Sequence, residues 1–253
     1  MTRWAAGLLL GVAAGALALM VVSPRVGGPH SAPKAPAAGS GPQATAKLPA
    51  ATPSAPGATS SALAATSSAL AGMPYAQRFA AVCAACHGAN GRMETPLTPV
   101  LAGQPSLYVI TQLFLFREGR RSNEAMTAVA RTMTDDDLRG FSELIGTLPP
   151  VPPPPPATPP DPSRMARGRT LAEQHKCVFC HGAGLGGGQQ VPCIGGQHED
   201  YLQASLRGFR AGSRPGYTQA MTTAVSQIPP EDLDTLAYYV ARFRDPAEAR
   251  TGK

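Results

Sequence analysis

Two five-residue stretches carry the side chains best suited to chemistry. They read CAACH at residues 83–87 and CVFCH at residues 177–181. In each, two thiols three positions apart share one face of a helical turn, and an imidazole follows directly. Such a pair suits a redox dithiol, half of a zinc site, a structural disulfide or covalent attachment of haem. The residues concerned are Cys83, Cys86, His87, Cys177, Cys180 and His181.

Covalent haem uses all three side chains of each motif, whereas the alternatives do not. A zinc site usually places its ligand pairs ~12–20 residues apart, but Cys86 and Cys177 are 91 positions apart. A redox dithiol needs no adjacent histidine. Structural disulfides, the plain outcome for exported cysteines, are the remaining alternative. We therefore expect two covalently bound haem c groups, with His87 and His181 as iron ligands.

The sixth iron ligand decides whether such a haem binds small molecules or mainly carries electrons. Met221 is the one methionine downstream of His181. The sequence that follows CAACH is similar to the sequence that follows CVFCH, so that each motif begins one copy of a repeat, and Met126 is the residue of the first copy that corresponds to Met221. A methionine more often fills a core than binds a metal, but the match between the copies favours both as ligands. Histidine and methionine together raise the reduction potential relative to two histidines. We expect two low-spin haems of high potential.

The comparison of the two copies also identifies other candidates for the sixth iron ligand and a hydrogen bond that would orient the ligand histidines. Met93 and Met133 are further candidates in the first copy but have no counterpart in the second. His198 is a rival in the second copy and also lacks a counterpart. Pro99 and Pro192 occupy equivalent places after the two motifs. A backbone carbonyl there can accept a hydrogen bond from the ligand histidine and orient its ring.

The two motifs begin two copies of one sequence plan. After each motif the same series of Pro, Gly-Gln, Tyr, Phe-Arg, Gly, Met and Leu recurs at a nearly constant offset, which indicates an internal duplication. The apolar periodicity and the capping residues predict helices, with no alternating strand pattern. The helices are expected at 75–87, 105–118, 166–181 and 199–211, and the last helices of the copies begin at Thr134 and Pro229.

The N-terminus carries an apolar segment without charges at residues 4–22. As a helix it is ~29 Å long, about the thickness of a bilayer core. We expect residues 1–22 to be an uncleaved membrane anchor, with a cleaved signal peptide as the alternative. Either one exports the rest of the chain. The predicted location is therefore the periplasm, tethered to the inner membrane by residues 4–22.

Two segments have the composition of linkers. Residues 23–72 consist mainly of Ala, Pro, Ser, Thr and Gly, which predicts a disordered linker. Residues 149–162 contain ten prolines and predict a semi-rigid polyproline spacer of up to ~40 Å. The folded domains are then expected at 73–148 and 163–253.

The net charge of +6 gives no support for a nucleic-acid partner. Four of these positive charges precede the folded copies, and the copy at 73–148 has seven basic and seven acidic residues. Neither copy has a basic stripe with interleaved aromatic residues, which is the usual footprint of nucleic-acid binding.

With these residues in hand, the chain resembles tandem dihaem class I cytochromes c of the c4 type. The resemblance covers 75–148 and 163–245 and rests on CxxCHG, the run PVLAGQ…Y…QL…FREGRR, and a methionine followed by a DDDL helix. It implies an all-α fold of two tandem class I cytochrome c domains, each a small helical fold wrapped around a covalent haem. The axial ligands that it implies are His87 and His181 on the proximal side, Met126 and Met221 on the distal side.

The resemblance implies a periplasmic electron carrier without enzymatic activity of its own. Its donor would be a quinol-oxidising complex or a dehydrogenase, and its acceptor a terminal oxidase. A haem enzyme (a peroxidase or an oxidase of sulfur compounds) and a dedicated subunit of one dehydrogenase are the alternatives. Cys193 is expected to be a small apolar pocket residue, with a site for an intermolecular disulfide as the alternative. Basic side chains that would dock a partner, pair with haem propionates or stay solvated are Arg117, Arg120, Arg121, Arg207, Arg210 and Arg214.

Overall fold

The computed structural model describes residues 70–215 and 219–244. The predicted membrane anchor and nearly all of the predicted N-terminal linker lie outside these residues. Within them, the secondary structure is helical apart from one isolated bridge between Gly188 and Val191. The prediction of an all-α fold is thereby confirmed for the described part of the chain. No helix in that part is long and apolar enough to cross a membrane.

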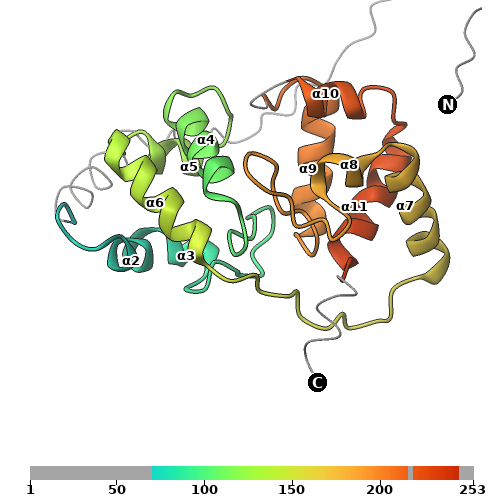
Figure 1. The fold of residues 1–253 in the computed structure, drawn as a ribbon, viewed down its shortest axis with the longest axis horizontal. Coiled ribbons are helices and arrows are strands. Elements are labelled where there is room, and N and C mark those ends of the chain that lie inside the picture. The colour runs from blue at the N-terminus through green and yellow to red at the C-terminus, as the bar shows by residue number, and fades with distance from the viewer. Residues whose placement is uncertain (1–69, 216–218, 245–253) are drawn as a thin grey trace, which may run out of the picture. The chain divides into compact units, whose positions relative to one another are not determined.

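The helices form two groups, which we call the first copy (residues 75–148) and the second copy (162–244), joined by residues 149–161 (Figure 1). The first copy contains α2 (Tyr75–Arg78), η1 (Phe79–Cys83), α3 (Ala84–His87), α4 (Ser106–Arg117), α5 (Glu124–Ala130) and α6 (Asp135–Thr147). The second contains α7 (Pro162–Gln174), α8 (Cys177–His181), α9 (Glu199–Arg210), α10 (Ala220–Val225) and α11 (Pro230–Arg242).

The first copy is built around the packing of α4 on α6, with α2 and η1 against the same core. This core consists of the buried side chains of Phe79, Val109, Leu113, Leu138, Phe141 and Ile145. Burial of each such side chain contributes ~1.5–3 kcal/mol. The ion pair of Arg78 with Asp137, 2.6 Å long and with both side chains nearly buried, ties α2 to the start of α6.

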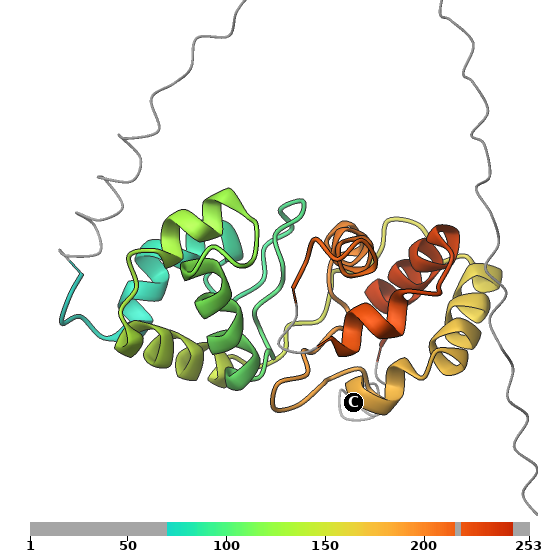
Figure 2. The ribbon, with the colours of Figure 1, turned by 90° about the horizontal axis from the view of Figure 1, so that it is seen from above.

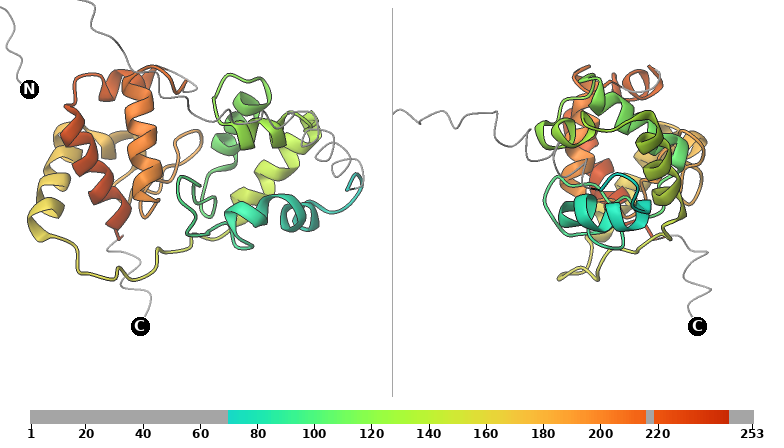
Figure 3. Two further views of the ribbon diagram at one scale, coloured as in Figure 1. Left: turned by 180° about the vertical axis from the view of Figure 1, so that it is seen from behind. Right: turned by 90° about the vertical axis from the view of Figure 1, so that its left-hand side faces the viewer.

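The second copy is built around α11, which packs against both α7 and α9. In Figure 2 the red α11 runs beside the yellow α7, and Figure 3 shows it between α7 and the orange α9. Gly168 permits the close approach of α7, because a Cβ there would lie 2.3 Å from the Cβ of Tyr239. The core of this copy is separate from that of the first copy and includes Leu171, Leu202, Ile228, Leu233 and Leu236.

Both copies interrupt their first helix just before the CxxCH motif. In the first copy the predicted helix at 75–87 is present, but the backbone forms a π-helical turn at Phe79–Cys83. In the second copy the predicted continuous helix at 166–181 is wrong. It begins at Pro162 and breaks at Lys176, whose backbone is left-handed with φ of 56°. The motif itself then forms the separate short helix α8.

The ends of the later helices follow the capping signals of the sequence. Gly119 and Gly212 have positive φ after α4 and α9, as expected for glycines that follow a helix end. Thr134 caps α6, and its side chain and that of Asp137 form a reciprocal capping box. Pro229 is the N-cap of α11. The predicted starts of both last helices are therefore confirmed.

The polyproline segment lies against both copies instead of holding them apart. A Cβ on Gly103 would meet Pro150 at 3.1 Å, and one on Gly196 would meet Pro153 at 2.9 Å. Arg244 donates a hydrogen bond of 2.9 Å to the Pro153 carbonyl. The two glycines are equivalent in the repeat, so the linker uses corresponding places on the two copies.

Candidate haem centres and the contact between the copies

Each motif histidine is fixed by one backbone carbonyl. Nδ1 of His87 lies 2.9 Å from the carbonyl oxygen of Pro99, and Nδ1 of His181 lies 3.0 Å from that of Pro192. A carbonyl only accepts, so Nδ1 carries the proton in both rings. The equivalent positions of Pro99 and Pro192 in the repeat predicted this hydrogen bond in both copies, and the structure confirms it.

Both imidazoles are buried in their neutral form. Burial lowers the pKa of His87 and of His181, and the hydrogen bond to the proline carbonyl opposes this shift. With Nδ1 donating to a carbonyl, the lone pair of Nε2 stays available. A neutral ring held in this way is the usual state of a metal-binding histidine.

The four motif thiols occupy two different environments. Cys83 and Cys177 are half-buried at the edge of the two cores, whereas Cys86 and Cys180 are exposed, and none of the four forms a disulfide. Burial raises the pKa of the Cys83 thiol to about 12, against the opposing charge of Arg78, and burial also raises the pKa of Cys177. Burial therefore keeps both thiols uncharged near neutral pH.

The two candidate methionines border the same cores as the first cysteine of each motif. Met126 lies on α5 beside the first core, and Met221 lies on α10 beside the second. The side-chain oxygen of Asn123, the N-cap of α5, accepts a hydrogen bond of 2.9 Å from the backbone nitrogen of Met126. Met133 also borders the first core, whereas Met93 is 39% exposed. Neither α5 nor α10 was predicted, because each is only about two turns long.

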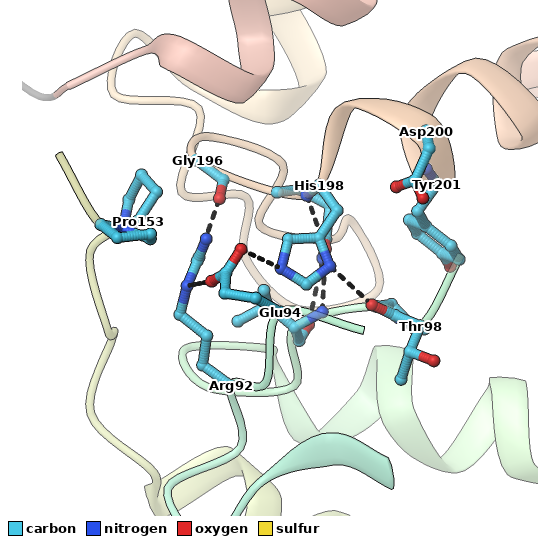
Figure 4. A network of polar contacts seen from close by, with 12 residues as sticks. Arg92, Glu94, Thr98, Pro153, Gly196, His198, Asp200 and Tyr201 are labelled. Carbon is cyan, nitrogen blue, oxygen red and sulfur yellow. Dashed lines mark hydrogen bonds and ion pairs between the residues drawn. The ribbon is translucent and has the colours of Figure 1, made fainter. Parts of the chain in front are cut away.

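His198, the rival ligand of the second copy, is engaged elsewhere. Its Nδ1 donates to the carbonyl of Thr98 in the first copy at 2.7 Å, and its Nε2 lies 3.4 Å from a carboxylate oxygen of Glu94 (Figure 4). Arg92 donates one hydrogen bond to the carboxylate of the same Glu94 and another, of 3.0 Å, to the carbonyl of Gly196. His198 is therefore part of the contact between the copies.

Two equivalent glutamines form the centre of this contact. Gln197 bonds both backbone groups of Val100, accepting from its nitrogen at 2.8 Å and donating to its carbonyl at 3.1 Å. Gln104 donates to the carbonyl of Cys193 at 2.7 Å. Both glutamines are 5% exposed. Gly103-Gln104 and Gly196-Gln197 match in the sequence repeat, but the repeat alone does not show that they face each other.

A cluster of two tyrosines and two arginines lies across the same contact. The hydroxyl of Tyr201 accepts from Arg121 at 3.0 Å and from Arg214 at 3.1 Å, and Arg214 also donates to Tyr108 at 3.3 Å. Burial opposes ionisation of Tyr201, but the two guanidinium charges outweigh it and lower its pKa. Burial raises the pKa of Tyr108.

This cluster fits an anionic group. Its two guanidinium groups are bonded to phenol and amide oxygens and, within the described residues, to no carboxylate. The Nε atom of Arg214 is buried without a hydrogen-bond partner. A haem propionate would supply the missing acceptor and the opposite charge. Arg121 and Arg214 can thus hold propionates.

Two of the other arginines considered as docking or propionate residues have acidic partners within their own copy. Arg117 bonds Glu118 and Asp135 at 2.9 and 2.8 Å. Arg207 bonds Asp234 at 2.6 Å. Of the six basic residues considered, Arg121 and Arg214 are the two that contact the opposite copy.

Comparison with known proteins agrees with this arrangement. The family model for cytochrome c matches the chain twice, at residues 76–144 and 165–243. Cytochrome c4 of Thiocapsa roseopersicina is 31% identical over 170 residues, covering 63% of this chain and 85% of that protein. The thiosulfate dehydrogenase electron acceptor of Thiomonas intermedia is 34% identical over 168 residues, covering 58% and 77%. The structure of reduced cytochrome c4 from Pseudomonas stutzeri has a TM-score of 0.60 at 27% identity, covering 67% and 97%.

Proposed function

This chain belongs to the cytochrome c family, in its tandem dihaem group represented by cytochrome c4, and we propose that it relays single electrons between redox proteins of the periplasm. Its resemblance to these cytochromes is confirmed. It carries two covalently bound haem c groups and serves electron transfer. The residues assigned to the haems, the location and the redox partners given below are part of this proposal.

His87 and His181 are the proximal ligands in this proposal, and the thioether bonds form at Cys83, Cys86, Cys177 and Cys180. When bound, haem supplies an iron that alternates between Fe(III) and Fe(II). The observation that carries this assignment is the repeated bond from Nδ1 of the histidine to a proline carbonyl, at 2.9 and 3.0 Å. It leaves Nε2 of a neutral ring to bind the iron in both copies.

Met126 and Met221 complete the coordination as distal ligands. Support comes from their equivalent places in the repeat and from their position at the edge of the core that also borders Cys83 or Cys177. Two protein ligands per iron leave no open position for a substrate. Electron transfer without enzymatic activity therefore suits the site better than peroxidase chemistry or oxidation of sulfur compounds.

The contact between the copies carries the residues that would hold propionates of the haems. Arg121 and Arg214 would hold propionates there, and Tyr108 and Tyr201 would position the two guanidinium groups. Because this cluster joins side chains of both copies, Arg121 and Arg214 would hold propionates at the contact between the copies. An electron could then enter at one haem and leave from the other.

The N-terminal residues 1–22 serve export in this proposal. They act as an inner-membrane anchor through residues 4–22, or else as a signal peptide that is removed. Intact-mass analysis of the protein extracted from membranes distinguishes the two. A mass that includes residues 1–22 and two haems supports the anchor, whereas a shorter chain in the soluble fraction supports the cleaved signal.

The donor is a quinol-oxidising complex or a dehydrogenase, and the acceptor is a terminal oxidase. A second candidate role is the electron acceptor of a thiosulfate dehydrogenase. It is favoured by the relative from Thiomonas intermedia, which bears that name and is 34% identical to this chain. Both roles use the same two haems, and they differ only in the protein that donates the electron.

Stopped-flow reduction of the oxidised holoprotein tests the proposal. One mixture contains thiosulfate and a purified thiosulfate dehydrogenase, and the other contains a quinol and a quinol-oxidising complex. Rapid reduction of both haems by either donor supports the carrier, and the faster donor identifies the role. Reduction by neither donor, together with rapid binding of peroxide or carbon monoxide, would overturn it in favour of a haem enzyme.

A further inference from the structure

We infer that Gln197, in the second copy, is a positioning residue for the haem of the first copy. It acts through the Pro99–Val100 peptide on the hydrogen bond that His87 donates, and it thereby lowers the reduction potential of that haem. The inference rests on the proposed role of His87 as iron ligand.

One peptide group connects the two copies at this point. Its carbonyl oxygen, that of Pro99, accepts from Nδ1 of His87 at 2.9 Å. Its nitrogen, that of Val100, donates to Oε1 of Gln197 at 2.8 Å. A continuous chain of hydrogen bonds therefore runs from the imidazole of the first copy through this peptide to the amide of the second copy.

The direction of the effect follows from the polarisation of this peptide. When its N–H donates to Gln197, its carbonyl becomes a better acceptor, because successive hydrogen bonds strengthen one another by roughly 10–30%. A stronger bond from Nδ1 of His87 makes the imidazole a more basic ligand. A more basic ligand stabilises Fe(III) over Fe(II), so the contact with Gln197 lowers the potential.

The orientation of the Gln197 amide is fixed by its surroundings. Oε1 accepts a second bond from the backbone nitrogen of His198 at 3.0 Å, and Nε2 donates to the carbonyl of Val100 at 3.1 Å. The neighbouring carbonyl of Thr98 is bonded to His198 at 2.7 Å. Gln197 is 5% exposed, so water does not replace it easily. The segment around Pro99 is thus held by the second copy on both sides.

The equivalent glutamine of the first copy provides a matched control. Gln104 is equally buried and lies in the same contact, but it donates to the carbonyl of Cys193 and its own Oε1 has no hydrogen-bond partner. Among the described residues, Gln104 forms no hydrogen bond with the Pro99–Val100 peptide. Replacing Gln104 therefore weakens the contact between the copies without altering the acceptor of His87.

The experiment is a redox titration of the full-length holoprotein and its Gln197→Met and Gln104→Met variants, followed by NMR of the haem methyl groups. Methionine keeps the volume of glutamine and removes its hydrogen bonds. In Gln197→Met we expect the Fe(II)/Fe(III) ratio of the first haem, measured at a fixed potential, to rise roughly twofold to threefold. At ~59 mV per tenfold change in this ratio, the midpoint potential of that haem rises by about 18–28 mV. The second haem stays unchanged, and Gln104→Met leaves the first haem unchanged.

A direct reading of the hydrogen bond accompanies the titration. In the reduced protein, the Nδ1 proton of His87 should move upfield in Gln197→Met, as expected for a weaker bond, and should not move in Gln104→Met. An unchanged midpoint and proton shift in Gln197→Met would overturn the inference. So would an equal shift in both variants, which would assign the effect to loosening of the contact between the copies. A wild-type protein without low-spin, histidine-bound iron contradicts the proposed function instead.

Discussion

The carbonyl oxygen of Pro99 lies 2.9 Å from Nδ1 of His87, and the same bond recurs between Pro192 and His181 at 3.0 Å. These bonds hold two buried, neutral imidazoles in the same way in both copies. They also place each ring at the end of its CxxCH helix with Nε2 free to bind iron. The two candidate haem sites therefore follow one pattern.

Removing one pair of motif cysteines should remove one haem only. Because the two copies have separate cores, replacing Cys177 and Cys180 by serine leaves the first copy able to fold around its own haem. Intact-mass analysis and the haem absorbance per chain should show one haem in this variant and two in the wild type. Loss of both haems, or retention of both, would show that the sites are not independent.

Replacing Asp137 by asparagine should destabilise the holoprotein near neutral pH by ~3 kcal/mol, because a nearly buried Arg78 is left without its partner. Burial opposes the charge of Asp137, but its bonds with Arg78 and Thr134 lower its pKa. A carboxyl group with a lowered pKa stabilises the fold above its unfolded value of ~3.9 and loses this effect as the pH falls through the folded value.

Denaturant unfolding of both proteins between neutral and acidic pH checks this prediction. The difference between wild type and Asp137→Asn should be complete at pH 7 and should shrink below about pH 4. A difference that stays constant over this whole range would mean that the charge of Asp137 is not the cause.

Replacing Gly168 by alanine should separate α7 from α11. The new Cβ would lie 2.3 Å from the Cβ of Tyr239 and 3.0 Å from the carbonyl oxygen of Thr235, so the helices must move. Such overpacking costs ~1–3 kcal/mol, and the thermal unfolding temperature should fall. Gly186→Ala is the control, since its Cβ would meet nothing within 4 Å. Equal stability of the two variants would contradict the packing described for α7.

Replacing Arg214 by glutamine should lower the midpoint potentials. If Arg214 holds a propionate as proposed, its positive charge disfavours Fe(III), so its removal favours oxidation by on the order of 1 kcal/mol. Arg210, an exposed residue at the end of α9, is the matched control. Potentiometric titration should show a shift for Arg214→Gln and almost none for Arg210→Gln. Similar midpoint potentials in the two variants would show that Arg214 does not hold a propionate.

The local pattern of the sequence was sufficient to predict most of the principal helices and the two haem c groups. Capping residues marked the starts at Thr134 and Pro229, and glycines marked the ends of α4 and α9. The equivalence of Pro99 and Pro192 predicted the hydrogen bonds of both motif histidines. These features depend on neighbouring residues, or on a comparison of the two copies, and both are visible in one sequence.

The contact between the copies could not be predicted in the same way. The proline-rich composition of the linker indicates stiffness but does not show that Pro150 and Pro153 pack on the copies. His198 was a candidate ligand in the sequence, whereas its ring bonds Thr98, 100 positions away in the chain. The break at Lys176 was also missed, because a left-handed lysine has no local sequence signal.

The charge-transfer band between methionine sulfur and ferric iron tests the central claim most directly. It should be measured in the oxidised holoprotein and in the Met126→Ala, Met221→Ala and double variants, with Met133→Ala as control. The account predicts about half of the wild-type band in each single variant, none in the double variant, and an unchanged band in Met133→Ala. A band that persists in the double variant, or that disappears in Met133→Ala, would contradict the assignment of Met126 and Met221 as the distal ligands.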